Sequence, residues 1–346
     1  MTETLTETVS ARHFGLFDHL DNNGTESPGE HYRQRLALIG QCDDGTFHGY
    51  HLAEHHCTPL GQACSPSVFL AAVAARTERL RIIPTIYPLP LYHPIRLLEE
   101  VAMLDHLSQG RLEIGVGPGG SPPEQLMFGV NPEQAMPAFM EAYDVFKQGL
   151  TSGKVRYDGK HFQFDRSEVF MRCQQTPHPP LWYGASSDRS VQWLAGEGMN
   201  MLTGGNFERL RLVSATYRQH YRSALDGLEP KVGAVRRLVI AETDEQALQV
   251  ADPAYRRWFY NMNYLWEKSG TDIGRFHRSL GAAIDNDVAF VGSPETVTEM
   301  INAYFRETGC NYLVFAPIFG DIDLNSATTT LELFRNHVLP MVREAS

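Results

Sequence analysis

The sequence predicts an α/β protein: one (β/α)8 (TIM) barrel over residues 1–346, with an insertion after the seventh strand. Three observations lead there. Strand-like and helix-like segments alternate along almost the whole chain, and no obvious linker divides the 346 residues. The hydrophobic fraction of 42% can supply a large core. No GxGxxG follows the first expected strand, which disfavours the runner-up, a doubly wound open sheet.

Eight short apolar segments are expected to form the strands. The clearest case comes fourth, where Leu112, Ile114 and Val116 point one way and Glu113, Gly115 and Gly117 the other. The two glycines leave part of one face without side chains, which invites close approach by something flat or charged. In chain order, the expected strands cover 13–17, 49–54, 80–87, 112–117, 181–184, 199–203, 232–242 and 312–317.

Apolar residues at helical spacing separate these strands. The best example is 94–107, where Pro94 suits the first helical position and Gly110 follows the last turn. Ser65-Pro66 is a similar helix start. In chain order, the expected helices cover 32–39, 68–76, 94–107, 133–150, 188–195, 208–224, a segment from 244, 294–307 and 324–342.

Two segments interrupt the alternation. Residues 154–170 turn at Asp158-Gly159 and predict a small hairpin. Residues 252–288 contain RRWFYNMNYLW followed by several glycines, and we expect a partly helical insertion that can serve as a lid. Its aromatic run, 258–266, predicts core or interface packing first and a wall over a flat ligand second.

Charge and composition exclude several classes of protein. The net charge of -11 disfavours a general nucleic-acid binder. The sequence contains no run of about 18 apolar residues, so no membrane span is expected. The N-terminal segment lacks the pattern of a signal peptide, so a cytoplasmic location is expected. The five cysteines are scattered without a CxxC pair, so neither a disulfide framework nor a structural zinc site is expected.

In a barrel, chemistry belongs where the strands end. Glu54-His55-His56 ends the second strand, and a histidine there can exchange a proton near neutral pH. Solvated loop histidines are the plainer interpretation. No HxH or HExxH spacing is present, so no metal site is expected.

The fifth strand ends in a segment of small hydroxyl residues that begins a helix. Ser186, Ser187 and Ser190 can hold a phosphate at the helix N-terminus, while ordinary capping by Ser187 or Asp188 explains the same residues equally well. A carboxylate at Asp188 counts against the phosphate unless it points away.

Several blocks of the chain resemble the bacterial luciferase-like flavin-dependent monooxygenases. The resemblance runs in order from about residue 12 to about residue 343. It is carried by AEHHC at 53–57, HPIRLLEEVAMLDHLSQGRLEIGVGPG at 93–119, PPLWYGASSDRSVQWLAGEG at 179–198, VGSPETVTEMI at 291–301 and NYLVFAPIFG at 311–320.

The resemblance implies an enzyme that binds reduced FMN at the mouth of a (β/α)8 barrel. Oxygen adds to the flavin, and the resulting flavin hydroperoxide oxygenates a small organic substrate. A separate NAD(P)H:flavin reductase supplies the reduced flavin, and the oxygenase is typically a homodimer. A non-catalytic flavin-binding homologue and a deazaflavin-dependent hydride-transfer enzyme are the alternatives, and the EHH segment favours the monooxygenase.

The resemblance also implies roles for particular residues. His55 matches the catalytic histidine, and the peptide bond between Thr85 and Ile86 matches a cis bond under the flavin. The implied cofactor-binding residues are Glu54, Thr85, Ile86, Gly117, Ser186, Ser187 and Ser190. Pro118 departs from the pattern, because family members can carry an arginine there that reaches the phosphate.

Overall fold

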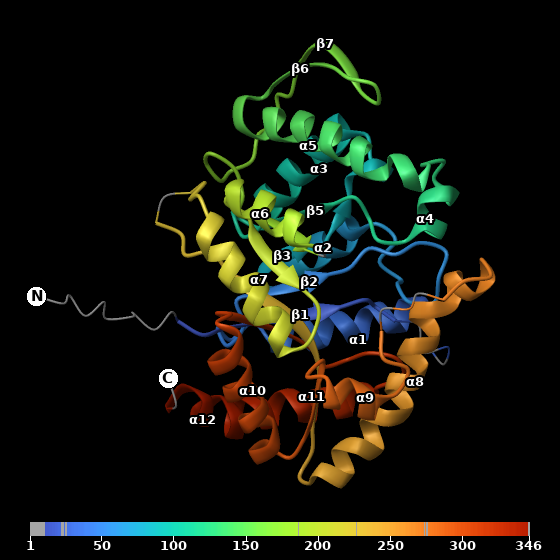
Figure 1. The fold of residues 1–346 in the computed structure, drawn as a ribbon, viewed down its shortest axis with the longest axis vertical. Helices are drawn as coiled ribbons and strands as arrows, with labels where there is room; N and C mark the ends of the chain where they lie inside the picture. Colours follow the sequence, from blue (N-terminus) through green and yellow to red (C-terminus); the bar gives the residue numbers. More distant parts are fainter. Residues whose placement is uncertain are drawn as a thin grey trace, which may run out of the picture.

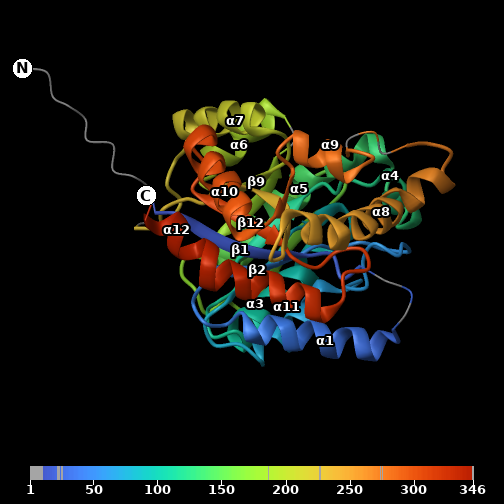
Figure 2. The ribbon, with the colours of Figure 1, turned by 90° about the horizontal axis from the view of Figure 1, so that it is seen from below.

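The structure of this protein is a computed structural model that describes residues 11–21, 24, 26–185, 187–225, 227–272, 274 and 276–344. Its strands form a parallel sheet that curls into a nearly closed barrel with helices around it (Figures 1 and 2). The sheet consists of β1 (His13–Asp18), β2 (Gly49–Leu52), β3 (Arg81–Pro84), β4 (Tyr87–Pro88), β5 (Ile114–Gly117), β8 (Leu181–Ala185), β9 (Asn200–Thr203), β10 (Val232–Ile240), β11 (Ala289–Gly292) and β12 (Tyr312–Ala316).

The helices cover the outside of this sheet. They are α1 (Pro28–Gln41), α2 (Pro66–Ala74), α3 (Pro94–Leu107), α4 (Pro122–Met127), α5 (Ala135–Ser152), α6 (Asp188–Gly196), α7 (Phe207–His220), α8 (Asp244–Lys268), α9 (Leu280–Asp285), α10 (Pro294–Thr308), α11 (Leu324–Leu333) and α12 (Leu339–Glu344). Short 3-10 turns cover Leu89–Leu91 and Pro132–Gln134, and a π turn at Phe334–Val338 joins α11 to α12. None of the described helices combines the length and apolar character that crossing a membrane requires.

The order of the strands confirms the expected barrel. Neighbouring strands follow the order β3-β2-β1-β12-β10-β9-β8-β5-β4, and β11 pairs separately with β10. A parallel bridge between Ile82 and Leu112 brings β3 beside the segment that enters β5. The ring thus returns nearly to its start, and the carboxyl ends of the strands meet at one mouth.

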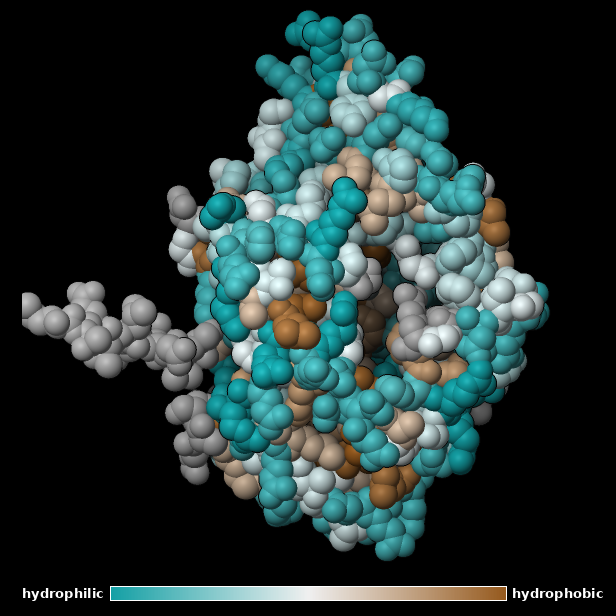
Figure 3. Space-filling model, in the orientation of Figure 1, coloured by the Kyte–Doolittle hydropathy of each residue, from teal (hydrophilic) through white to brown (hydrophobic). Residues whose placement is uncertain are grey.

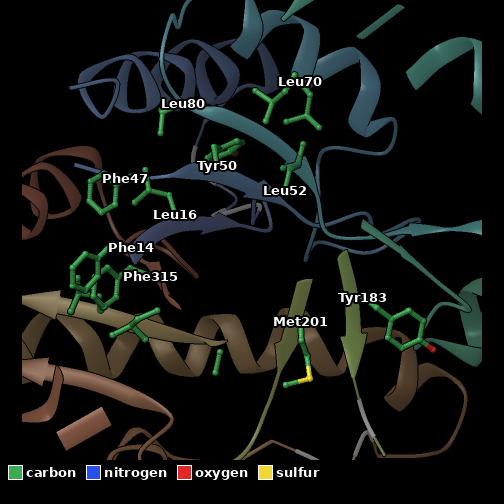
Figure 4. Close-up of a cluster of buried hydrophobic side chains, with 14 of the residues drawn as sticks. Phe14, Leu16, Phe47, Tyr50, Leu52, Leu70, Leu80, Tyr183, Met201 and Phe315 are labelled. Atoms are coloured by element: carbon green, nitrogen blue, oxygen red, sulfur yellow. The ribbon is translucent and has the colours of Figure 1, made fainter. Parts of the chain in front are cut away.

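The core has two layers because successive strand residues face opposite sides of the sheet. Figure 4 shows part of the outer layer, where Phe14 of β1 and Phe315 of β12 stack with their ring centroids 5.7 Å apart. Inside the barrel a smaller cluster consists of Phe17, Ala53, Ile83, Trp182, Leu202, Tyr312, Val314 and Ala316.

The expected elements agree with the structure to within a few residues, apart from four differences and the boundaries of the insertion after the seventh strand. The third strand, expected over 80–87, is divided into β3 and β4, and α4 and β11 were not expected at all. The last helix is interrupted by its π turn. The hairpin at 154–170 is confirmed as β6 (Lys154–Asp158) and β7 (Gln163–Glu168), at the top of Figure 1.

The insertion after the seventh strand is present, but its boundaries differ from those expected. Helix α8 runs without a break from Asp244 to Lys268, with Pro253 inside it, so residue 252 begins no new element. The segment 252–288 therefore contains the second half of α8 together with α9, and β11 follows it. β11 pairs in parallel with residues 237–240 of β10, which extends the sheet beyond the ring.

Candidate active site

A cavity lies at the carboxyl ends of β2 and β3. Figure 3 shows the surface hollowed near the centre of one face, to the left of the regions that Figure 1 labels α4 and α8. The lining residues come from four regions: the end of β2 and its loop, the Thr85–Leu91 segment, α4 with the glycines before it, and the second half of α8. They are Ala53, Glu54, His55, Thr58, Leu60, Thr85, Ile86, Pro88, Leu91, Gly119, Gly120, Ser121, Glu124, Gln125, Met262, Leu265 and Trp266.

His55 is held in this cavity by a carboxylate from another element. Its Nδ1 lies 3.0 Å from Oε1 of Glu124, which belongs to the first turn of α4. The His55 side chain is 23% exposed and that of Glu124 is 9% exposed, so water only partly screens the pair. This contact orients the imidazole and leaves Nε2 as the nitrogen that can exchange a proton with a ligand.

Glu54 is buried beside His55 and is held from two sides. The hydroxyl of Tyr92 donates a hydrogen bond to Oε2, and Nε2 of His56 lies 2.8 Å from Oε1. Burial raises the pKa of the Glu54 carboxyl above its ordinary value, although both contacts oppose that shift. Glu54 thus lines the cavity as a fixed group, with limited freedom to move toward a ligand.

The peptide bond between Thr85 and Ile86 is cis, as the resemblance implied. Beneath it, Nδ1 of His51 lies 2.8 Å from the Thr85 hydroxyl, and Nε2 of His51 lies 2.8 Å from the Tyr312 hydroxyl. Burial lowers the pKa of His51 to about 3, so this ring is neutral at physiological pH. Thr85 is therefore anchored to the interior of the barrel.

The two glycines of β5 have different neighbours from those we expected. A Cβ on Gly117 would lie 2.5 Å from Cδ1 of Ile86, and a Cβ on Gly115 would lie 2.3 Å from the Pro84 carbonyl oxygen. The bare face of the strand makes room for the chain around the cis bond. Gly117 therefore supports Ile86, which itself lines the cavity, and contact of Gly117 with a cofactor stays a prediction.

The serine segment after β8 forms an N-terminal cap. Ser187 accepts a hydrogen bond from the Ser190 amide, and the Ser190 hydroxyl accepts one from the Ser187 amide, which is a capping box at the start of α6. Capping, one of the two expected roles, is thus observed. Ser186 lies outside the described residues, and phosphate binding by the three serines stays a prediction.

The aromatic run of α8 packs in the core, as expected first, and also lines the cavity, while contact with a flat ligand stays a prediction. Trp258 is fully buried in the core, whereas Met262, Leu265 and Trp266 line the cavity one and two turns later. The Thr58 hydroxyl also donates to the carbonyl of Asn261, at 3.3 Å, which ties the loop after β2 to this helix. The second half of α8 is therefore one wall of the site.

Sequence reasoning did not find Glu124, Tyr92 or His51. Glu124 follows Gly119-Gly120-Ser121-Pro122, a helix start after a strand end, and that signal could have revealed it. His51 alternates with Gly49 and Ala53 on one face of β2, which marks it as inward-facing. Tyr92 gives no comparable signal, because only the fold brings it to Glu54.

No group of three or more histidine, cysteine or acidic side chains that could hold a metal ion exists among the residues that the structure describes. The cavity does suit a flat organic cofactor. Ile86, Pro88 and Leu91 supply an apolar wall for a ring system, and Glu54, His55 and Glu124 place polar groups beside it. The residues present therefore fit a flavin.

Comparison with known proteins identifies the family. The family described as luciferase-like monooxygenase matches residues 12–312 of the chain. The chain belongs to this family, as its sequence blocks led us to expect.

The relatives include several monooxygenases. The chain is 33% identical to the protein y4wF of Sinorhizobium fredii, over 95% of this chain and 97% of that protein. It is 34% identical to limonene 1,2-monooxygenase of Rhodococcus erythropolis, over 89% of this chain and 80% of that protein. It is 26% identical to the oxygenase component of the flavin-dependent trigonelline monooxygenase of Acinetobacter baylyi, over 76% and 74% of the two chains.

Solved structures show the same fold. The monooxygenase RslO1 of Streptomyces bottropensis superimposes with a TM-score of 0.84, at 24% identity over 95% of this chain and 99% of that chain. The oxygenating constituent of 3,6-diketocamphane monooxygenase of Pseudomonas putida, in complex with FMN, gives 0.78 at 20% identity, with coverages of 95% and 99%. An F420-dependent secondary alcohol dehydrogenase gives 0.73 at 18% identity, over 96% and 99% of the two chains.

Proposed function

We propose that this protein is a flavin-dependent monooxygenase that uses reduced FMN and O2 to oxygenate a small organic substrate. The observation that carries the proposal is His55, oriented by Glu124 in a cavity whose floor includes the cis Thr85–Ile86 bond. The named functions of the limonene and trigonelline relatives support the same reaction class.

Each residue of the site has a role in this proposal. Reduced FMN, when bound, supplies the electrons that activate O2. Ile86 and Pro88 offer an apolar surface to the ring system, with Gly117 supporting Ile86 from behind. Ser186, Ser187 and Ser190 hold the phosphate at the N-terminus of α6. Because Pro118 replaces an arginine, the serines contribute most of the phosphate binding.

His55 moves the proton. Its Nδ1 is held by Glu124, and its Nε2 donates to or accepts from the reacting group. Glu124 is a positioning residue, and Glu54 helps fix the loop through Tyr92 and His56. The wall formed by α8 excludes water, and residues 252–288 close over the bound substrate as a lid.

The proposal includes two partners. One is a separate NAD(P)H:flavin reductase, as suggested by the relative that is an oxygenase component. The other is a second copy of the chain, since Val68 of α2 and Met103 and Leu107 of α3 expose apolar side chains on adjoining helices. Light scattering after size exclusion measures this dimer directly.

The test is an anaerobic titration of the purified protein with photoreduced FMN, followed by mixing with O2 in a stopped-flow instrument. We expect reduced FMN to bind and its reoxidation to differ in rate from that of free reduced FMN. Absence of binding would refute the proposal. Binding followed by reoxidation at the rate of free flavin would favour a non-catalytic flavin-binding protein.

The same titration with reduced F420 tests the alternative, hydride transfer from a deazaflavin. We expect weak binding or none. Tight binding of F420, with transfer of hydride to a carbonyl compound and without consumption of O2, would replace the proposed function.

A further inference from the structure

Two consecutive arginines of β10 have opposite environments. Arg236 faces outward, where its Nη2 donates to the carbonyl of Gly205 at 2.8 Å and its guanidinium lies 5.7 Å from the Tyr304 ring centroid. Arg237 faces inward, because it pairs in register with Ala316 of the interior cluster. Ala316 is the last residue of β12, so Arg237 projects at the mouth of the barrel.

Arg237 makes neither a hydrogen bond nor an ion pair with the residues that the structure describes. Its guanidinium carbon lies 3.2 Å from the ring centroid of Trp258, with Tyr255 and Phe319 at 5.6 and 5.8 Å. Its Nε is buried and has no acceptor in the part of the chain that the structure describes. An arginine in such surroundings is costly unless an acceptor reaches it.

Trp258 gives a second, independent observation. Its side chain is fully buried, and its indole Nε1 likewise has no acceptor among the described residues. Two neighbouring donors, one of them charged, therefore lie side by side and unsatisfied. An acceptor with negative charge satisfies both, whereas a neutral apolar ligand satisfies neither.

The protein supplies little negative charge here. The nearby Asp21 accepts a hydrogen bond from the Gly320 amide at 2.9 Å, and no carboxylate oxygen of a described residue lies within 4.0 Å of the Arg237 guanidinium. Burial raises the pKa of Asp21 to about 7, which weakens it as a counter-charge. His19, whose ring lies 5.6 Å from that of His55, is neutral because burial lowers its pKa.

Arg237 and the cavity share one wall. Met262 and Trp266 follow Trp258 by one and two turns, so the three side chains lie on one face of α8. The guanidinium that covers Trp258 therefore lies against the same face of α8 as the cavity lining. His19 interacts electrostatically with both Arg237 and His55.

We propose that Arg237, together with the indole N–H of Trp258, binds a carboxylate group of the organic substrate. This rests on the proposed function, and it deepens it by naming the substrate class: a small organic acid whose apolar part extends along α8 toward His55. The planar guanidinium offers a carboxylate parallel N–H donors, which a lysine would not. The carboxylate anchors the substrate and takes no part in the oxygen transfer.

The test uses benzoate and cyclohexanecarboxylate as probes, each beside its neutral amide, in ligand-observed NMR titrations of the full-length protein. We expect each acid to bind at least about tenfold more tightly than its amide. Arg237→Gln should bring the ratio close to one, Arg237→Lys should leave part of it, and Trp258→Phe should reduce acid binding severalfold. Arg256→Gln, an exposed arginine of α8 paired with Asp252, is the control and should retain the full ratio.

Two outcomes would overturn the assignment. One is equal binding of acids and amides by the wild-type protein. The other is an undiminished preference for acids over amides in Arg237→Gln. This includes the case in which that variant loses affinity for FMN, which would assign Arg237 to cofactor binding. If Arg237→Gln does not fold, Arg237→Lys and Trp258→Phe decide by the same ratio. The titrations also run without flavin, so a failure to bind reduced FMN refutes the proposed function separately.

Discussion

The two ends of the barrel each bury a glutamate, and the pKa values of the two carboxyl groups are shifted in opposite directions. Glu113, at the amino-terminal end, lies 2.9 Å from Nε2 of His48, pairs with Arg81 and accepts a hydrogen bond from the indole of Trp182. Burial alone would raise its pKa, but these cations hold it at about 2. Glu54, at the carboxyl-terminal mouth, has no arginine or lysine partner among the described residues, and burial raises its pKa.

The difference indicates that charged groups at the amino-terminal end stabilise the fold, whereas polar groups at the mouth remain available to a ligand. At the amino-terminal end the charges neutralise one another. At the mouth, the Nε2 of His55 and the donors of Arg237 and Trp258 have no protein partner among the described residues. Hydrogen-bonding groups that have no protein partner are the ones that can bind a ligand. Barrel enzymes place such groups at the carboxyl ends of the strands. The following experiments test this division, from the largest expected effect to the smallest.

Glu113→Gln removes the negative charge from among His48, Arg81 and Lys231 and leaves these half-buried groups without their buried carboxylate partner. We expect the free energy of unfolding in urea at pH 7 to fall by about 3–5 kcal/mol. In the wild type this stabilisation is present above the ordinary glutamate pKa and is lost as the pH falls toward 2. Binding of flavin by the folded fraction should remain.

Glu229→Gln is the control at the same end, because its side chain is 47% exposed, and we expect a loss below about 1 kcal/mol. Equal losses in the two variants would contradict a network centred on Glu113.

His55→Ala removes the group that, in the proposed function, moves the proton. We expect kcat to fall about 10²- to 10³-fold, which corresponds to about 3–4 kcal/mol in the barrier. Binding of reduced FMN and the unfolding free energy should change little, because the side chain is partly exposed. Unchanged turnover would remove His55 from the mechanism.

Glu124→Gln extends this test to the residue that positions His55. It should lower kcat less than His55→Ala does and should shift the pH profile of kcat, since it changes the group that contacts Nδ1 of the ring that moves the proton in the proposed function. A purely structural role would leave the profile in place.

Asp21→Asn tests how a buried carboxyl group at the mouth makes the unfolding free energy depend on pH. Burial raises the pKa of Asp21 from 3.8 to about 7, so its contribution to stability is present below the ordinary value and is lost as the pH rises through 7. We expect the unfolding free energy of Asp21→Asn relative to wild type to grow by on the order of 2–3 kcal/mol between pH 5 and pH 8. Parallel stability curves for the two proteins would exclude this coupling.

Ser187→Ala is expected to have the smallest effect on stability of these substitutions at the site. Loss of the capping box should lower the unfolding free energy by about 1 kcal/mol. If the serines also bind phosphate, the affinity for FMN should fall severalfold while that for riboflavin stays the same. An equal change for both flavins would assign Ser187 to capping alone.

The sequence by itself was enough to predict the barrel and part of the site. Alternating strand and helix periods, with the caps at Pro94 and Gly110, locate most elements to within a few residues because these signals are local. The ordered blocks around His55 and the cis Thr85–Ile86 bond also predicted where the cavity would lie. Strand β11 was not predicted, because four apolar residues between helices do not by themselves indicate a strand.

Only the tertiary structure decided which groups meet. Glu124 follows His55 by 69 residues, and Trp258 follows Arg237 on a different element, so no local pattern connects them. The glycines of β5 looked like space for a ligand, but the structure fills that space with Ile86 and the Pro84 carbonyl. A periodic pattern indicates which face of a strand is bare or buried, whereas what lies against that face depends on packing between distant segments.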